Sequence, residues 1–309
     1  MKNYKQRRFI PGECMHIYQR SINGFNVFYD VEDYLVFYTI FSVLSRIYQV
    51  SILELCLMRD HLHSLIVAQS LSEISAFIRH YSSLFVMEFN NHVGRHGQFF
   101  HKSYGSAPKK GSKKIRSAII YIGNNPVEKG LCVHASEYRW NFLAYLEDRN
   151  PFSQYRPYNS LGSKLRKSLK LIRQEAGKNK YLNYSMLGLL FDGLSHDEQE
   201  YLIDYIITSY WPFDNESLLS YYDNVEDMFI AMKSTAGNEY DIKEKFYSGS
   251  DRIYDEMIRV VRENAGIVPV RRVTVLKDDL KLEIAGMLHQ MTTASKFQLS
   301  KFLHWEGGV

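Results

Sequence analysis

Cysteine is scarce in this chain, with three residues in 309, at positions 14, 56 and 132. They are widely spaced and odd in number, so they form neither a metal-type pair nor a complete set of disulfides, which fits a reducing compartment. No stretch of the sequence approaches the ~20 apolar residues that a membrane helix needs, and the polar, basic start at residues 1–8 does not resemble a signal peptide. We therefore expect a cytoplasmic protein that makes no membrane contact.

A large excess of one charge is also missing, since 38 Lys and Arg residues face 34 Asp and Glu, for a net charge of +4. This mildly basic balance permits nucleic-acid binding without requiring it. Hydrophobic residues make up 45% of the chain and charged residues 23%, which is typical of a folded globular protein and excludes a disordered one. No internal repeat is evident, so repeat architectures are excluded as well.

Strand and helix patterns alternate through the first 150 residues, which predicts an α+β domain whose sheet is covered by helices. The expected strands cover residues 13–22, 51–58, 61–67 and 99–106. The expected helices cover residues 30–48, 70–91 and 113–124, and the last of them is predicted to end at Asn125-Pro126. Residues 108–112 are predicted to be a flexible connection.

Asn, Pro, Ser and Tyr gather at residues 151–162, which predicts a linker between a domain at 1–150 and a mostly helical domain at 163–309. The helical patterns of the second domain cover residues 164–176, 184–191, 196–209, 216–234 and 250–264. Two further helical patterns, at 282–291 and 296–304, are joined by a short polar turn. They suggest a helix-turn-helix unit at 280–305, although any helical hairpin would look similar.

The triplet His61-Leu62-His63 begins a predicted strand, so both imidazoles point to the same face and could hold one divalent metal ion. With 11 histidines in the chain, one such triplet can also arise by chance, and a structural role is the alternative. The position at the start of a strand favours the metal site, because ligands at a sheet edge stay accessible to a substrate.

The helix predicted at 113–124 carries two distinct faces. Its apolar face packs on the sheet, and Lys114, Ser117, Tyr121 and Asn125 follow at spacings of 3, 4 and 4, which places them together on an adjacent face. This second face combines a cation, a hydroxyl, a phenol and an amide, as a site for phosphate and metal would. The alternatives are that Tyr121, one of 23 tyrosines, is a buried structural residue and that Asn125 only ends the helix.

Basic residues gather in front of this helix, where they oppose the helix dipole and therefore suggest a role other than stability. Neutralising a DNA backbone is such a role, and a solvated loop is the alternative. The cluster consists of Lys102, Lys109, Lys110, Lys113, Lys114 and Arg116.

Together these blocks resemble the HUH (histidine-hydrophobic-histidine) single-tyrosine transposases, especially the REP-associated and IS200-like branch. The resemblance covers about residues 9–147 and is carried by ordered motifs rather than by one triplet. These motifs are 15–20 (MHIYQR), 30–34, 57–63 (LMRDHLH), 97–104, 121–131 (YIGNNPVEKGL) and 138–140 (YRW).

The resemblance implies a ferredoxin-like antiparallel sheet and a divalent metal, Mg²⁺ or Mn²⁺, held by His61, His63 and Asn125, with Tyr121 as the nucleophile. One departure is Arg59-Asp60 in place of the usual Pro-Asn, which puts a carboxylate beside the metal site. Asp60 could alter the metal preference or be a ligand itself. The residues expected to contact DNA are Arg20, Lys102, Lys109, Lys110, Lys113, Lys114 and Arg116.

The activity that the resemblance implies is cleavage and rejoining of single-stranded DNA near hairpins, through a 5′-phosphotyrosine intermediate. Strand transfer would be completed by using one tyrosine twice or by pairing with the tyrosine of a second subunit in a homodimer. The protein would act at the nucleoid. Two alternatives share the same features: a domesticated, catalytically silent protein that binds a DNA hairpin, and a metal-dependent hydrolase in which Tyr121 is structural.

Overall fold

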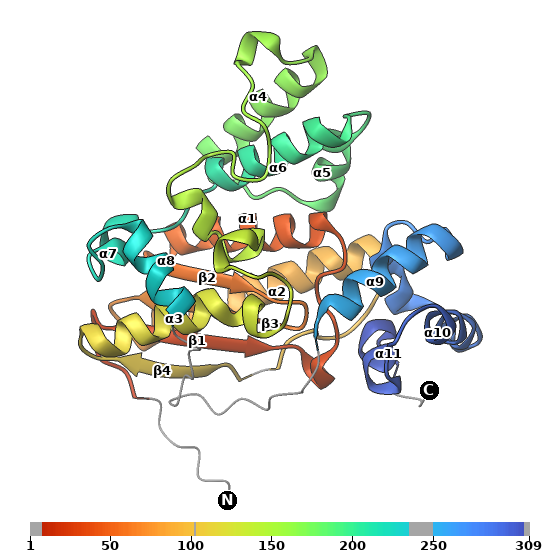
Figure 1. Ribbon diagram of the computed structural model, residues 1–309, viewed down its shortest axis with the longest axis horizontal. Coiled ribbons are helices and arrows are strands. Elements are labelled where there is room, and N and C mark those ends of the chain that lie inside the picture. Colours follow the sequence, from red (N-terminus) through yellow and green to blue (C-terminus); the bar gives the residue numbers. More distant parts are fainter. Residues whose placement is uncertain (1–7, 102, 235–249, 306–309) are drawn as a thin grey trace, which may run out of the picture.

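The computed structural model describes residues 8–101, 103–234 and 250–305. Strands and helices alternate through the first part of the chain (Figure 1). In chain order they are β1 (Cys14–Arg20), α1 (Val31–Ile47), β2 (Ser51–Leu57), β3 (His61–Val67), α2 (Leu71–Val93), β4 (Gly105–Lys109) and α3 (Ser112–Glu128).

The four strands form one sheet in the order β2-β3-β1-β4, and every neighbouring pair is antiparallel. The chain order β-α-β-β-α-β with this strand order is the ferredoxin-like arrangement. The predicted α+β class and ferredoxin-like sheet are therefore confirmed. β2 and β3 are joined by the two-residue turn Arg59-Asp60, which the backbone N–H of Met58 closes by donating to the carbonyl of His61 at 2.9 Å.

Alternate residues of each strand point to opposite faces of the sheet. Ile17, Leu55 and Leu62 lie in the same buried cluster as α1 and α2. Cys14 and Leu65 instead pack with Ile119 and other apolar residues of α3. The sheet is thus covered on both faces, and the histidines of β3 lie on the α3 side.

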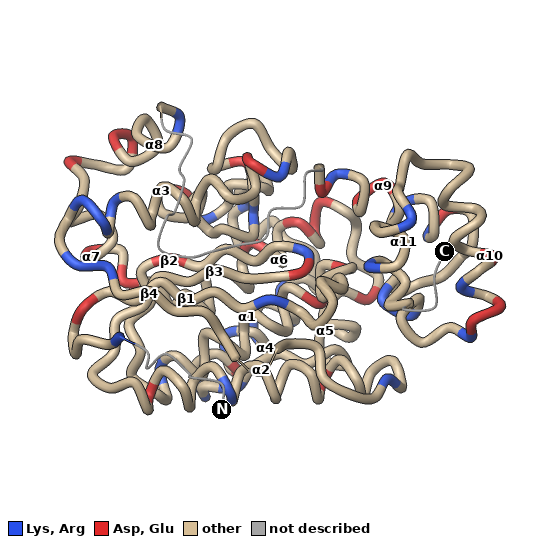
Figure 2. Tube along the Cα trace, turned by 90° about the horizontal axis from the view of Figure 1, so that it is seen from below, with Lys and Arg blue, Asp and Glu red and all other residues tan. Residues whose placement is uncertain are grey.

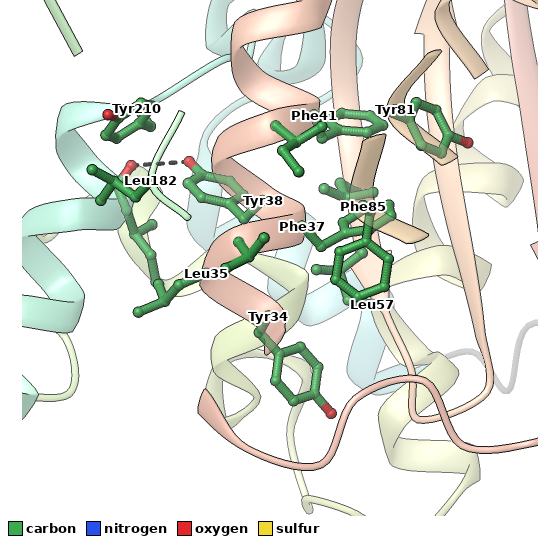
Figure 3. Close-up of a cluster of buried hydrophobic side chains, with 14 of the residues drawn as sticks. Tyr34, Leu35, Phe37, Tyr38, Phe41, Leu57, Tyr81, Phe85, Leu182 and Tyr210 are labelled. Atoms are coloured by element: carbon green, nitrogen blue, oxygen red, sulfur yellow. Dashed lines mark hydrogen bonds between the residues drawn. The ribbon is translucent and has the colours of Figure 1, made fainter. Parts of the chain in front are cut away.

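An aromatic core fixes α1 against α2. Phe37 lies 5.5 Å from Tyr81 and 5.3 Å from Phe85 between ring centroids, and Phe41 lies 5.3 Å from Tyr81 (Figure 3). Each aromatic contact of this kind contributes about 0.5–1.5 kcal/mol beyond its area burial. This core supports one face of the sheet, and the histidines of β3 lie on the opposite face.

The helices that follow are shorter and cover three sides of this platform (Figure 1). They are α4 (Ser163–Gly177), α5 (Tyr184–Phe191), α6 (His196–Ser209), α7 (Asn215–Leu219), α8 (Val225–Ser234), α9 (Arg252–Val260), α10 (Asp278–Met291) and α11 (Lys296–Leu303). Helices α4–α6 extend the buried cluster of α1, where Tyr38 donates to the carbonyl of Ile207 at 2.9 Å. Helix α8 packs on α3, and α9–α11 form a third cluster that includes Tyr29.

Three expectations about secondary structure are wrong. The strand predicted at 99–106 begins only at Gly105, because Phe100 forms just an isolated bridge with Ser21 and Phe99 packs on Phe89, with centroids 4.6 Å apart. Pro108, expected in a flexible connection, lies inside β4, where an edge strand tolerates the missing N–H. The helix predicted at 216–234 is divided into α7 and α8.

A fourth expectation, on the end of α3, is also wrong, because the helix does not stop at Asn125-Pro126 but continues to Glu128. Pro126 lies in the last turn of the helix, where its missing N–H removes a single hydrogen bond. The backbone N–H of Lys129 still donates to the carbonyl of Asn125 at 3.1 Å. Asn125 is therefore a helical residue, one turn beyond Tyr121.

Among the residues that the structure describes, no helix is both long and apolar enough to cross a membrane. The domain boundaries at 150 and 162, and a helix-turn-helix role for α10 and α11, stay predictions.

Candidate active site

The two histidines of β3 are buried on the face of the sheet that α3 covers. His61 is 1% exposed and His63 is fully buried, and their ring centroids lie 5.1 Å apart. In the register of β1 and β3, Arg20 is opposite His61 and Tyr18 is opposite His63. The predicted pair thus projects from one strand toward one space.

His61 is held on one side by its neighbour Asp60. The Nδ1 atom of His61 lies 2.5 Å from Oδ1 of Asp60, while its Nε2 atom is buried with no hydrogen-bond partner among the described residues. The second oxygen of Asp60 lies 3.6 Å from Nε of Arg20 and 3.5 Å from Nζ of Lys301 in α11.

Burial alone would raise the pKa of the Asp60 carboxyl, but the charge and hydrogen bond of His61, followed by the charges of Arg20 and Lys301, outweigh it. The pKa is therefore held well below its usual value, and Asp60 is a carboxylate.

His63 contacts residues from two other elements. Its Nδ1 atom lies 3.0 Å from Nε2 of His16 in β1, and its Nε2 atom lies 3.3 Å from the amide nitrogen of Asn125 in α3. Burial, followed by the charges of His61, His16 and Arg20, lowers the pKa of His63 well below its usual value. The imidazole is therefore neutral, which is the form that binds metal ions.

Tyr121 lies beside this pair because α3 packs its apolar face on the sheet. The phenol ring is 2% exposed, with its centroid 5.4 Å from that of His63 and 5.8 Å from that of His16. Asn125, one turn later, is 4% exposed, and its Oδ1 atom has no hydrogen-bond partner among the described residues. The structure thus brings together the four residues that the sequence singled out, on β3 and α3.

The donor set fits a divalent cation in its chemistry: two imidazoles and an amide oxygen, with Nε2 of His61 and Oδ1 of Asn125 lacking hydrogen bonds. A cation would satisfy both buried atoms. Within residues 8–101, 103–234 and 250–305, no group of three or more His, Cys, Asp or Glu side chains is arranged to hold a metal ion.

Other residues at the site are not singled out by sequence patterns alone. His16 and Tyr18 lie on the same face of β1 as Arg20, and the period of two along this strand is the one signal that could have found them. Asp251, next to α9, is near enough for its pKa to respond to Asp60 and His61. No local pattern connects Asp251 or Lys301 with a strand about 200 residues earlier.

The predicted DNA-binding residues do not form one group. Lys110, Lys113 and Lys114 are exposed where β4 leads into α3, and Figure 2 shows basic residues gathered there. The guanidinium of Arg116 instead lies 4.6 Å from the ring centroid of Tyr222. Lys109, at the end of β4, is 1% exposed and therefore not at the surface.

Arg20 is partly buried and lies near Asp60, as described above. Lys102 lies outside the described residues. The exposed lysines are thus the candidates for contact with a DNA backbone.

Two comparisons with known proteins give a match. Residues 14–125, a little over a third of the chain, match the family model described as "Transposase IS200 like". Among solved structures, the chain is similar to a REP-associated tyrosine transposase bound to a REP hairpin, at 16% sequence identity and a TM-score of 0.42. The similarity covers 53% of this chain and 96% of that one.

No curated protein matches the chain. The matched segment spans the whole ferredoxin-like sheet and α3 as far as Asn125, and so it contains both histidines and the tyrosine. Residues 14–125 therefore belong to the IS200-like, single-tyrosine (HUH) transposase family.

Proposed function

We propose that the protein is a metal-dependent single-stranded DNA transposase that cleaves and rejoins strands next to hairpins. The observation that carries the proposal is the contact between Tyr121 on α3 and His63 on β3, with Asn125 on the same side of α3. A catalytically silent DNA-binding protein has no need for a phenol, two imidazoles and an amide buried together.

In this proposal His61, His63 and Asn125 hold Mg²⁺ or Mn²⁺ through the nitrogen and oxygen atoms described above. The ion would supply charge stabilisation at the scissile phosphate. Tyr121 loses its proton and attacks the phosphorus, forming a bond from its oxygen to the 5′ phosphate while the bond to the 3′ oxygen breaks. The 3′ oxygen leaves as a hydroxyl, and the energy of the broken ester is kept in the phosphotyrosine.

The reverse reaction rejoins strands, because a different 3′ hydroxyl can attack the phosphotyrosine and release Tyr121. One tyrosine can be used twice, or two subunits can each contribute one, so a homodimer is one of the two arrangements compatible with transfer. Either arrangement acts on the cell's own DNA, which favours a place in the cytoplasm at the nucleoid.

The DNA partner is proposed from charge and from the family. Lys110, Lys113 and Lys114 are exposed at the beginning of the helix that carries Tyr121, so a phosphate backbone bound there would lead toward the tyrosine. The REP-associated relative was solved with a REP hairpin. We therefore infer that this chain binds a hairpin with a single-stranded flank.

The test uses a labelled single-stranded oligonucleotide with an inverted repeat from the flanks of the gene, incubated with Mg²⁺ or Mn²⁺. We expect a covalent protein–DNA adduct on a denaturing gel, absent from Tyr121→Phe and strongly reduced in His61→Ala. Tyr155→Phe, which changes a tyrosine that is 69% exposed, is the matched control and should keep the adduct.

Cleavage at the wild-type rate by Tyr121→Phe would contradict the proposal and favour a metal-dependent hydrolase. Tight hairpin binding without an adduct, with both metals and several flanking sequences, would indicate the domesticated DNA-binding protein instead.

A further inference from the structure

Asp60 occupies the turn between β2 and β3, directly before His61, and is 7% exposed. Its Oδ1 atom lies 2.5 Å from Nδ1 of His61. With Arg20 and Lys301 within 3.6 Å of its other oxygen, Asp60 is a carboxylate and can only accept hydrogen bonds. In the neutral form of the His61 ring the proton therefore sits on Nδ1, and the lone pair is on Nε2.

The second oxygen of Asp60, Oδ2, also has partners in the protein. Nε of Arg20 in β1 and Nζ of Lys301 in α11 lie 3.6 and 3.5 Å from Oδ2. Both oxygens are thus engaged by protein groups, which leaves no oxygen of Asp60 directed toward the space between His61 and Asn125. This arrangement differs from the one expected of a metal ligand.

Helix α11 is fixed in the position from which Lys301 reaches Asp60. The backbone N–H of Asn26 donates to the carbonyl of Lys301 at 3.2 Å, and the hydroxyl of Tyr29 donates to the carbonyl of Phe302 at 2.6 Å. Gly24, with φ +66°, lies so close that a Cβ atom there would be 2.9 Å from Cε of Lys301. The loop after β1 therefore holds the lysine against the carboxylate.

We propose that Asp60 is a positioning residue that fixes the tautomer and ring orientation of His61, and that Lys301 makes α11 part of this support. The inference rests on the proposed function, in which His61 is a metal ligand. Carboxylate–histidine pairs orient metal ligands in this way in many proteins. Here the pair is built from the residue at which this chain departs from the usual family motif, so it is a property of this protein.

The first test compares Asp60→Asn with Asp251→Asn. Asp251 is also close enough to influence Asp60 and His61 electrostatically, but no hydrogen bond joins it to His61. Both variants remove one negative charge near the site. We expect Asp60→Asn to weaken Mn²⁺ binding about 10- to 100-fold, measured by electron paramagnetic resonance of the free ion, and Asp251→Asn to change it much less.

Nuclear magnetic resonance of the imidazole nitrogens reads the tautomer directly in the metal-free protein. The wild type and Asp251→Asn should carry the proton of His61 on Nδ1, and Asp60→Asn should populate the other tautomer. Addition of Mg²⁺ to the wild type should leave the Nδ1 proton in place. Loss of that proton on Mg²⁺ binding would contradict the proposal, because it would show that Asp60 moves to the metal. Equal losses of Mn²⁺ affinity in Asp60→Asn and Asp251→Asn would also contradict it, because the removed negative charge alone would then explain the loss.

A second variant tests the contribution of α11. Lys301→Met should speed exchange of the His61 Nδ1 proton with water, since Oδ2 of Asp60 then keeps Arg20 as its one neighbouring cation. Lys296→Met changes an exposed residue of the same helix and should leave the exchange rate unchanged. Equal exchange in Lys301→Met and the wild type would overturn the role of Lys301.

The tautomer measurement needs neither DNA nor metal, so it separates this inference from the proposed function. If the wild type binds no Mn²⁺ but His61 carries its proton on Nδ1 only when Asp60 is present, the proposed metal site fails and the positioning by Asp60 stands. If His61 carries its proton on Nε2 in the wild type, the inference fails whatever the enzyme activity.

Discussion

Buried carboxylates of this protein differ in the hydrogen bonds and opposite charges that surround them. Asp60 is surrounded by His61, Arg20 and Lys301, whereas Glu54 in β2 is 1% exposed and neither of its carboxylate oxygens has a hydrogen-bond partner among the described residues. Burial raises the pKa of Glu54 well above its usual value. The folded protein therefore favours the protonated carboxyl at this position.

This residue gives a prediction about pH and stability. Because the folded pKa of Glu54 is raised, its contribution to stability is present below the unfolded pKa and is lost as the pH rises toward the folded value. In that window the free energy of unfolding should fall by up to about 1.4 kcal/mol per pH unit. Glu54→Gln should flatten this dependence, and urea unfolding between pH 5 and 8 measures it. The same slope in both proteins would contradict the assignment.

Among the elements, α3 links the two parts of the proposed reaction. Its first turn is exposed and carries Lys113 and Lys114, and its later turns are buried and carry Tyr121 and Asn125. A strand bound at the beginning of α3 would therefore run along the helix toward the site.

Replacement of both lysines tests this role of the first turn. Lys113→Gln with Lys114→Gln should weaken hairpin binding and reduce the slope of log K against log salt by about 0.7 per lost phosphate contact, as expected for single strands. Fluorescence anisotropy at several salt concentrations measures both quantities. Lys167→Gln with Lys170→Gln, a pair of exposed lysines in α4, is the control and should preserve the slope.

Short-range patterns were sufficient to predict most elements of the first part of the chain. β3 begins and ends where its pattern does, at His61 and Val67, and α2 begins at Leu71, one residue after its predicted start, with Ser70 and Glu73 forming a capping box. The errors occur where tertiary packing outweighs local preference. Phe99 is buried without joining a strand, and Pro126 lies within α3, where it is buried together with Asn125.

The candidate site was predictable only in part, for a similar reason. His61, His63, Tyr121 and Asn125 could be found because the spacing within one strand and one helix places them on defined faces. The contact between Asp60 and Lys301 joins residues 241 positions apart, and no periodicity connects them. Whether the four residues hold a metal and attack DNA stays a prediction.

At the scale of the whole molecule, the helical region after residue 160 does not have one core of its own. Leu165, Leu187 and Ile206 lie in the same buried cluster as α1, while Met228 joins the cluster of α3. The third cluster, built from α9–α11, takes in Tyr29. The later helices therefore share buried clusters with α1, α3 and Tyr29.

Arg271 joins two of these regions. Its guanidinium is 3% exposed, lies 2.8 Å from Oδ1 of Asp33 in α1 and covers the ring of Tyr184 in α5 at 4.5 Å. Burial raises the pKa of Asp33 to about 6, although Arg271 acts to lower it. Removal of the cation would raise this pKa further.

Arg271→Met should destabilise the protein by about 3–5 kcal/mol, the usual cost of leaving one partner of a buried ion pair alone. The loss should be larger at pH 8 than at pH 5, because at pH 5 Asp33 takes up a proton and is no longer a buried charge without its partner. Thermal unfolding at both pH values measures the difference. Arg272→Met, at the exposed neighbouring position, is the control, and an equal loss there would contradict the prediction.

The contact between Asp60 and Lys301 also has a consequence for biosynthesis. The two residues are 241 positions apart, so at 5–20 residues per second the lysine is made about 12 to 50 s after the aspartate. For most of that interval the sheet, both histidines and Tyr121 are already on the nascent chain, but Asp60 lacks its contact with Lys301. The environment of His61 is therefore finished only when translation has passed residue 301, long after both histidines and Tyr121 have been made.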